Sequence, residues 1–299
     1  MHCSFPLRLL TVTAFLGFSH AAAVAQDNTL AHIAKTGEFR LGHREHSRPF
    51  SFKDPATGQV RGYSVDICTQ IFEEVKKELK RPDLRLTYVQ VDGKNRLADL
   101  KNNVVDVECG TTTNTLQRQK EVAFSHHIFF ATTVFLVRKD SGIKTLDDLQ
   151  GKRIAVERQT TNDSLLKANE ATHHRKFAYA LVDSAEQALA ALTSGKADAA
   201  FADDASLWSP MTQLGKAMGD YHFLPKHLSV EPYSIGLRRQ DPKFKEVVDH
   251  ATRRLAQSGE LAALYKKWFN SEQGMLPMSV FMREALKRPS DLGVEQIAF

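Results

Sequence analysis

The stretch between Val105 and Ser125 carries the residues best suited to bind a small anion. Alternating apolar residues from Val105 to Cys109 predict the end of a buried strand, and the Gly110–Thr113 turn that follows is rich in hydroxyls. A helix that begins after this turn leaves backbone N–H groups unpaired and places Arg118 one to two turns into it. Such donors, together with a guanidinium, favour a carboxylate. The alternative is a helix cap rich in Thr and Asn, followed by a solvated arginine.

A complementary acidic group follows a later strand. Residues 197–207 predict a strand that leads into a helix, with Asp203 and Asp204 at the carboxyl end of the strand. A carboxylate at that position is able to bind an ammonium group. The alternative is that these residues cap the helix, with Asp204 the favoured cap. A guanidinium and a carboxylate on separate segments together suit a zwitterion.

Two further arginines lie near the ends of predicted elements. Arg44 follows the first predicted strand, and open α/β sheets bind ligands at the carboxyl ends of their strands. Arg96 lies near the start of a short predicted helix, at the same rim of the sheet. The alternatives are a surface ion pair between Arg44 and Glu45, and solvent exposure of Arg96 beside Asp92 or Asp99.

A second polar turn leads into a helix between residues 157 and 166. It is another helix start at which backbone donors suit an anion. Thr160 and Thr161 add hydroxyl groups to it.

Strands and helices alternate along most of the chain, and these elements must position the groups above. Residues 62–79 predict an amphipathic helix with one apolar stripe. The order of elements predicts a parallel sheet covered on both faces, and it restarts after residue 146 in what we expect to be a second lobe. We expect further strands at residues 39–42, 84–91, 178–182 and 231–238, an apolar run at 128–137, and helices at 95–100, 184–194, 241–256 and 259–269.

Length, charge and the N-terminus bound the class of protein. The 299 residues are 42% hydrophobic, which is enough for a core in one large or two ordinary domains. The net charge of +5 is spread among 35 acidic residues, which indicates solubility rather than nucleic-acid binding. Residues 1–25 have the layout of a cleaved secretory signal, so the mature chain begins near Gln26. The alternative is a membrane anchor, for which the apolar run is short.

Cys68 and Cys109 remain after the signal is removed. In an oxidising compartment they are able to pair, but one lies on the apolar face of a helix and the other at a strand end, which equally predicts two buried thiols. Adjacent histidines at residues 126–127 and 173–174 lack the spacing of a zinc site. No phosphate loop or nucleophile elbow is present in the sequence. We expect neither a metal nor a cofactor.

The motif Gly110-Thr-Thr-Thr-Asn-Thr-Leu-Gln-Arg118, followed by Ala123-Phe-Ser125, resembles the signature of the polar amino-acid-binding proteins of bacterial ABC importers, bacterial extracellular solute-binding family 3. Segments 49–52, 62–66 and 258–269 match the same family. The resemblance is to its glutamate/aspartate-binding branch in the segments around residues 43–45, 95–96 and 108–110 and in the tail, residues 274–299. It covers nearly the whole mature chain.

The resemblance implies an α/β fold of the two-lobed periplasmic-binding-protein type (type II). Each lobe is expected to be a mixed, mostly parallel sheet flanked by helices, with two strands crossing between the lobes. We expect a first lobe at residues 26–132 and 232–299 and a second at 133–231. The protein would be a periplasmic monomer that closes about a hinge over a free amino acid and delivers it to the membrane subunits of an ABC permease.

The same resemblance implies a role for each candidate residue. The α-carboxylate would meet Arg118, Thr111 and Thr113, and the α-ammonium group would meet Asp203. The side chain of the ligand would meet Arg44, Arg96 and Thr161. Two cations beyond Arg118 are costly to desolvate around a neutral ligand, so they imply a second negative charge, that of glutamate or aspartate.

Two positions depart from the family pattern. Ala185 stands where the branch uses a second-lobe histidine, and Arg158-Gln159 stands where the family has a Gly-rich turn. A ligand other than an acidic amino acid is therefore an open alternative. Another is a cyclohexadienyl or arogenate dehydratase, since the fold family includes one. Such an enzyme needs a general acid or base facing the cleft, for which Glu157 or Asp204 would be the candidate.

Overall fold

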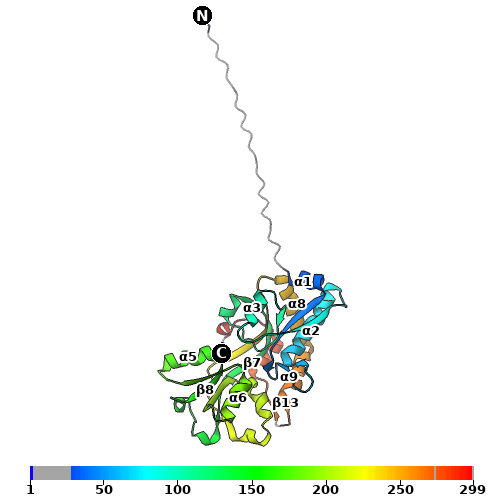
Figure 1. Ribbon diagram of the computed structural model, residues 1–299. Coiled ribbons are helices and arrows are strands. Elements are labelled where there is room, and N and C mark those ends of the chain that lie inside the picture. The colour runs from blue at the N-terminus through cyan, green and yellow to red at the C-terminus, as the bar shows by residue number, and fades with distance from the viewer. Residues whose placement is uncertain (3–27, 273, 298–299) are drawn as a thin grey trace.

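The computed structural model describes residues 1–2, 28–272 and 274–297 (Figure 1). The predicted secretory signal therefore lies almost wholly outside the described residues. Among the helices that are described, none has the length and apolar character needed to span a membrane.

The elements follow one another in the alternating order that the sequence predicts. The helices are α1 (Thr29–Thr36), α2 (Tyr63–Leu79), α3 (Arg96–Lys101), α4 (Leu116–Gln119), α5 (Thr161–His173), α6 (Ala185–Thr193), α7 (Asp204–Thr212), α8 (Pro242–Ser258), α9 (Glu260–Phe269) and α10 (Val280–Lys287). The strands are β1 (Glu38–His43), β2 (His46–Ser47), β3 (Ser51–Lys53), β4 (Val60–Arg61), β5 (Arg85–Gln90), β6 (Val107–Glu108), β7 (Val122–Arg138), β8 (Arg153–Glu157), β9 (Ala178–Val182), β10 (Ala199–Asp203), β11 (Tyr221–Phe223), β12 (Val230–Arg238), β13 (Asn270–Ser271) and β14 (Gly274–Met275).

The main sheet has the strand order β5-β1-β6-β12-β7-β10-β8-β9 and is mixed rather than wholly parallel. Strand β1 is parallel to β5 and β6, and β8 is parallel to β9 and β10. Strand β7 is antiparallel to β12 over one part of its length and to β10 over another. The strands that alternate with helices are parallel, as their order predicts. The antiparallel neighbours β7 and β12 in the middle of the sheet make it the mixed, mostly parallel sheet with two crossing strands that the family resemblance implies.

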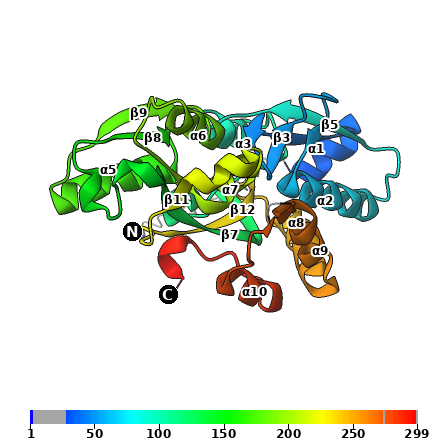
Figure 2. The ribbon, with the colours of Figure 1, turned by 90° about the horizontal axis from the view of Figure 1, so that it is seen from below.

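Strand β7 connects the two halves of the molecule. Its residues up to Thr132 pair with β12, and its residues from Thr133 onward pair with β10. Figure 2 shows the consequence: β8, β9, α5 and α6 gather at one end, β5, α1 and α2 at the other, and β7 and β12 run between them. This is the two-lobed arrangement expected from the sequence.

The start of β7 lies well before the apolar run that was expected at residues 128–137. Its first residues include polar side chains that are nonetheless buried, because each has a partner from another element. His126 Nδ1 lies 3.2 Å from Thr252 Oγ1 of α8, and His127 Nδ1 lies 3.0 Å from Ser234 Oγ of β12. Hydropathy alone does not reveal a strand whose polar groups are satisfied by tertiary contacts.

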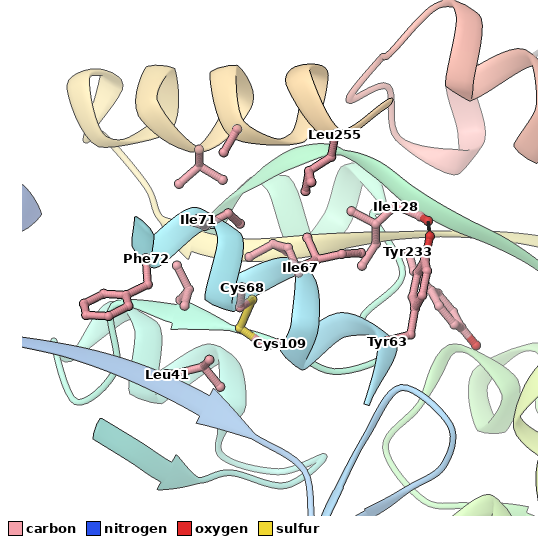
Figure 3. Packing of buried hydrophobic residues seen from close by; sticks show 14 of the residues in the cluster. Leu41, Tyr63, Ile67, Cys68, Ile71, Phe72, Cys109, Ile128, Tyr233 and Leu255 are labelled. Atoms are coloured by element: carbon pink, nitrogen blue, oxygen red, sulfur yellow. Dashed lines mark hydrogen bonds between the residues drawn. A yellow bond between two sulfur atoms is a disulfide. The ribbon is translucent and has the colours of Figure 1, made fainter. Parts of the chain in front are cut away.

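A disulfide between Cys68 and Cys109 fastens α2 to the end of β6 (Figure 3). Both cysteines are fully buried, so the two alternatives left open by the sequence are resolved in favour of a bond. The apolar stripe of α2 packs around it, with Ile67, Ile71 and Phe72 in the same cluster. The bond lies directly before Gly110, whose carbonyl accepts a 2.7 Å hydrogen bond from Ser64 Oγ of α2. The disulfide and this hydrogen bond therefore hold the start of the Gly110–Thr113 turn in place.

Candidate functional site

A cavity with an empty volume of about 430 Å³, including the space at its mouth, lies where the two halves of the molecule face each other. Its walls are polar and contain every residue that the sequence predicted for the site, together with the Ala185 position. The lining residues are Arg44, Arg96, Thr111, Thr113, Arg118, Glu157, Thr160, Thr161, Asn162, Ala185, Phe201, Ala202, Asp203 and Ser206.

The predicted anion-binding turn is present, but the helix after it is a single turn. Helix α4 covers only Leu116–Gln119, so Arg118 lies in its first turn rather than one to two turns along. Thr115 caps it, and its Oγ1 accepts a 3.1 Å hydrogen bond from the backbone N–H of Arg118. The guanidinium turns back toward the loop and donates from Nη1 to the carbonyl of Thr113 at 2.8 Å. The arginine expected to be solvated in the alternative interpretation instead faces the cavity.

Burial affects the charge of Arg118. Desolvation lowers the pKa of its guanidinium, and the nearby carboxylates of Glu231, Glu108 and Asp203 raise it in part. A cation in such a place gains from a further anion, because removing it from water has already been costly. The turn and the arginine together form a wall suited to a carboxylate.

Asp203 ends β10 and presents its carboxyl group to the cavity. Asn162 Nδ2 donates to Oδ1 at 3.0 Å, and the hydroxyl of Tyr233 donates to Oδ2. Burial, together with the charge of Glu231, raises the pKa of Asp203 to about 8. In the empty cavity this carboxyl group is therefore mostly protonated at neutral pH. An ammonium group placed beside it would favour the ionised form.

The structure does not follow the alternative in which Asp204 caps the following helix. Asp203 holds the cap position of α7, without a side-chain capping bond, and Asp204 is the first helical residue. The Asp204 carboxylate accepts hydrogen bonds from the backbone N–H and the hydroxyl of Thr132, at 3.1 and 2.7 Å. It therefore joins α7 to β7 and does not line the cavity.

Arg44 and Arg96 meet on one side of the cavity, and neither follows the alternative given for it. Arg44 Nη2 lies 2.6 Å from Glu157 Oε1, so its partner is a residue of the other half of the molecule and not Glu45. Arg96 is buried, with 3% of its surface exposed. Its Nε and Nη1 atoms have no hydrogen-bond partner among the described residues.

Keeping the Arg96 guanidinium charged in this buried position is energetically costly. Burial, together with the charges of Arg118 and Arg44, lowers the pKa of this guanidinium to about 9. Glu108 lies close enough to offset part of this effect, although both of its buried carboxylate oxygens also lack a hydrogen-bond partner among the described residues. A buried guanidinium with unpaired N–H groups is unfavourable unless an anion binds to it.

The hydroxyls of two of the three threonines predicted for the site converge on a residue that the sequence analysis missed. Thr113 Oγ1 and Thr161 Oγ1 both donate to Glu231 Oε2, at 2.7 and 2.8 Å. Glu231 lies in β12 and is 3% exposed. An acidic residue in an otherwise apolar strand was the available signal, because carboxylates are seldom buried without partners. Asn162 and Tyr233 were missed as well, and no sequence pattern points to them.

The turn after β8 contains a residue in the left-handed backbone region, and this residue is Gln159 rather than the glycine of the family pattern. Gln159 has φ of 60°, in the left-handed region, and its backbone N–H donates to Asp163 Oδ2 at 3.2 Å. Thr160 caps α5 by accepting a 3.2 Å bond from Asp163 N. At the start of α6, Ala185 presents only a methyl group to the cavity. Within the described residues, no group of three or more His, Cys, Asp or Glu is placed to hold a metal ion.

Comparison with known proteins gives consistent matches. Residues 39–271 match the family model of bacterial extracellular solute-binding proteins, family 3. An L-glutamate/L-aspartate-binding protein of Pseudomonas aeruginosa is 36% identical over 299 residues, covering 96% of this chain and 98% of the relative. A glutamate/aspartate import solute-binding protein of Salmonella typhimurium is 37% identical over 273 residues, covering 88% and 89%.

Among solved structures, the P235GK mutant of an arginine-binding protein (ArgBP) of T. maritima superposes with a TM-score of 0.70 at 29% identity. The match covers 81% of this chain and 100% of that one. The similarity therefore extends over both halves of the molecule.

Proposed function

The chain belongs to the bacterial extracellular solute-binding proteins, family 3, and from this we propose that it binds an acidic amino acid, glutamate or aspartate, for an ABC importer. It acts in the periplasm, takes up the free amino acid in the cleft between its halves, and delivers it to the permease subunits in the membrane. The names of the relatives at 36% and 37% identity support both the ligand class and the import function.

The observation in the cleft that carries the ligand assignment is Arg96. It is buried, two of its nitrogens have no hydrogen-bond partner among the described residues, and Arg44 lies on the same side of the cavity. Glu108 and Glu157 offset part of the charge of Arg96 but leave two of its nitrogens without an acceptor in the described part of the chain, and a ligand carboxylate would supply one. We therefore assign Arg96, with Arg44 and Thr161, to the side chain of the ligand.

The opposite ends of the ligand are assigned by charge. The α-carboxylate meets Arg118 and the turn that contains Thr111 and Thr113, and the α-ammonium group meets Asp203. The support is that the guanidinium and the carboxyl group come from different halves of the molecule and face the same cavity. A zwitterion bridging them would hold the two halves together.

The boundaries of the lobes follow the pairing of β7. We place the first lobe at residues 26–132 and 232–299 and the second at 133–231, because the partner of β7 changes from β12 to β10 between Thr132 and Thr133. We expect a monomer that opens and closes about these two strands. The protein returns its ligand unaltered, in keeping with the relatives, which are named as binding proteins. Incubation with prephenate or arogenate followed by product analysis tests this, and formation of phenylpyruvate or phenylalanine would contradict it.

A thermal-shift screen of the twenty common amino acids tests the ligand class. A ligand present at 100 times its dissociation constant adds about 2.7 kcal/mol of stability, which is readily measured. Glutamate and aspartate should raise the unfolding temperature most. A shift with neutral or basic amino acids and none with these two would refute the assignment.

The Arg96→Met variant tests the residue on which the assignment rests. Losing a charged hydrogen-bonding partner should cost about 1.5–3 kcal/mol, or roughly a 10- to 150-fold loss of glutamate affinity by titration calorimetry. Arg85→Met is a matched control, because Arg85 lies on the outer strand β5, its side chain is 72% exposed, and it forms a surface ion pair with Glu38 away from the cavity. Affinity should be unchanged in that variant.

A further inference from the structure

The side of the cavity that holds Arg44 and Arg96 already contains a carboxylate, which the protein itself supplies. Glu157 is the last residue of β8, and its Oε1 lies 2.6 Å from Arg44 Nη2 across the cleft. The side chain of Arg44 is 7% exposed and that of Glu157 is 16% exposed, so this ion pair is largely removed from water. It joins the two halves of the molecule at the place assigned to the side chain of the ligand.

Glu157 and Arg96 also lie close to each other, beside Gly93. A Cβ atom at Gly93 would lie 3.3 Å from Arg96 Nη1 and 3.8 Å from Glu157 Oε1. Both charged groups therefore lie against the same small patch of bare backbone. Of the two arginines, Arg44 is paired with the carboxylate of Glu157, and Arg96 keeps two nitrogens without a hydrogen-bond partner in the part of the chain that the structure describes.

A ligand carboxylate entering this region meets a group of the same chemistry and charge as its own. It must share Arg44 with Glu157 or displace Glu157 from it, and two carboxylates at one guanidinium repel each other. An amide side chain differs, because its NH₂ group is able to donate to Glu157 while the ion pair with Arg44 stays intact. The presence of Glu157 therefore disfavours an acid relative to the corresponding amide.

We propose that Glu157 is a specificity-determining residue, an internal carboxylate that competes with the side-chain carboxylate of the ligand for Arg44 and narrows the preference for glutamate over glutamine. This inference rests on the proposed function, since it concerns the side chain of the same ligand. It assigns Arg96 as the main contact of the ligand carboxylate and Arg44 as the contact that Glu157 contests.

The test compares glutamate and glutamine binding by titration calorimetry in the unaltered protein and in Glu157→Gln. The variant keeps the size of the side chain and removes its charge. Glutamate affinity should rise about tenfold, the lower end of the coupling found for close charge pairs at interfaces, while glutamine affinity should change less than about twofold. Glu157→Asp keeps the charge but shortens the side chain, so its glutamate affinity should lie between those of the unaltered protein and Glu157→Gln.

Glu186→Gln is the matched control, because Glu186 also pairs with an arginine across the cleft but outside the cavity. Its Oε1 lies 3.8 Å from Arg48 Nε, and the two side chains are 28% and 25% exposed. If the Glu157 pair acted only by holding the halves together, both variants would change glutamate and glutamine binding in parallel. The inference requires that the ratio of the two affinities change in Glu157→Gln and not in Glu186→Gln.

The outcomes separate this inference from the proposed function. Glutamate binding that is unchanged or weaker in Glu157→Gln, with binding to the unaltered protein intact, would overturn the role of Glu157 alone. A parallel change for both ligands would do the same. Failure of the unaltered protein and of Glu157→Gln to bind glutamate or aspartate at all would overturn the proposed ligand, and this inference with it.

Discussion

Ligand binding should release a proton from Asp203. Its carboxyl group is 7% exposed and receives hydrogen bonds only from Asn162 Nδ2 and the Tyr233 hydroxyl in the described structure. Burial and the charge of Glu231 raise its pKa to about 8. The proposed contact with an α-ammonium group needs the ionised form, so the ammonium must pull the pKa down and expel the proton.

The size of the effect follows from the raised pKa. At pH 6, about two units below it, roughly 1% of the molecules carry the ionised carboxylate. The affinity for glutamate should therefore rise by nearly tenfold per pH unit between pH 6 and 7.5 and level off above about pH 8. The same shift acts on the empty protein: the stabilising contribution of the protonated group is present at acid pH and is lost as the pH rises toward 8.

Calorimetry in two buffers of different ionisation enthalpy measures the proton directly. Close to one proton should be released per ligand at pH 6.5, and Asp203→Asn should show weaker binding with neither proton release nor a pH slope. An affinity that is constant from pH 6 to 8, with no buffer dependence in the unaltered protein, would mean that Asp203 is already ionised before the ligand arrives. The assignment of the raised pKa to the binding-competent protein would then be refuted.

Three further changes have outcomes that the structure predicts. Arg118→Ala should lower glutamate affinity by about 1.5–3 kcal/mol in calorimetry, because it removes a charged donor, and unchanged affinity would contradict the role given to the turn. Replacing both Cys68 and Cys109 by Ser opens a link between residues 41 apart and should lower the free energy of unfolding by up to about 4 kcal/mol in urea titrations. Gly62→Ala should destabilise by at least about 2 kcal/mol, since a Cβ there would lie 2.1 Å from the Phe50 carbonyl oxygen at φ of 142°. Gly58→Ala is its control, with φ of 69° and no atom within 4 Å, and it should cost less.

The elements that the sequence predicts well are those whose pattern is local. The amphipathic stripe expected at residues 62–79 corresponds to α2 (Tyr63–Leu79), and the strand expected at 178–182 is β9. The spacing of apolar residues within each segment indicates which face is buried, so no other part of the chain is needed to predict it. The early part of β7 has no such apolar pattern, because Ser125 and the two following histidines are buried polar residues whose partners lie elsewhere in the chain.

The candidate site divides in the same way. Arg44 and Asp203 were predicted because each follows a strand, and an open α/β sheet directs such positions toward one cleft. Arg96 was predicted near a helix start and Arg118 within the helix after a polar turn, and the family resemblance implied the role of each residue. The contacts between them were not predictable, since they depend on how the two halves meet. The sequence offers Glu45 as the neighbour of Arg44, but in the structure Glu157 of β8 lies 2.6 Å from Arg44 across the cleft instead.

Glu231 occupies the hydroxyl groups of two threonines that the sequence analysis had assigned to the ligand. Thr113 from one half and Thr161 from the other each donate their hydroxyl hydrogen to Glu231 Oε2. A hydroxyl has a single hydrogen to donate, so while these bonds persist both threonines face the cavity as acceptors. In that state they suit the α-ammonium group of a ligand. A ligand carboxylate gains a hydrogen bond from either threonine only if that hydroxyl leaves Glu231, and the exchange of this buried contact is therefore part of the free energy of binding.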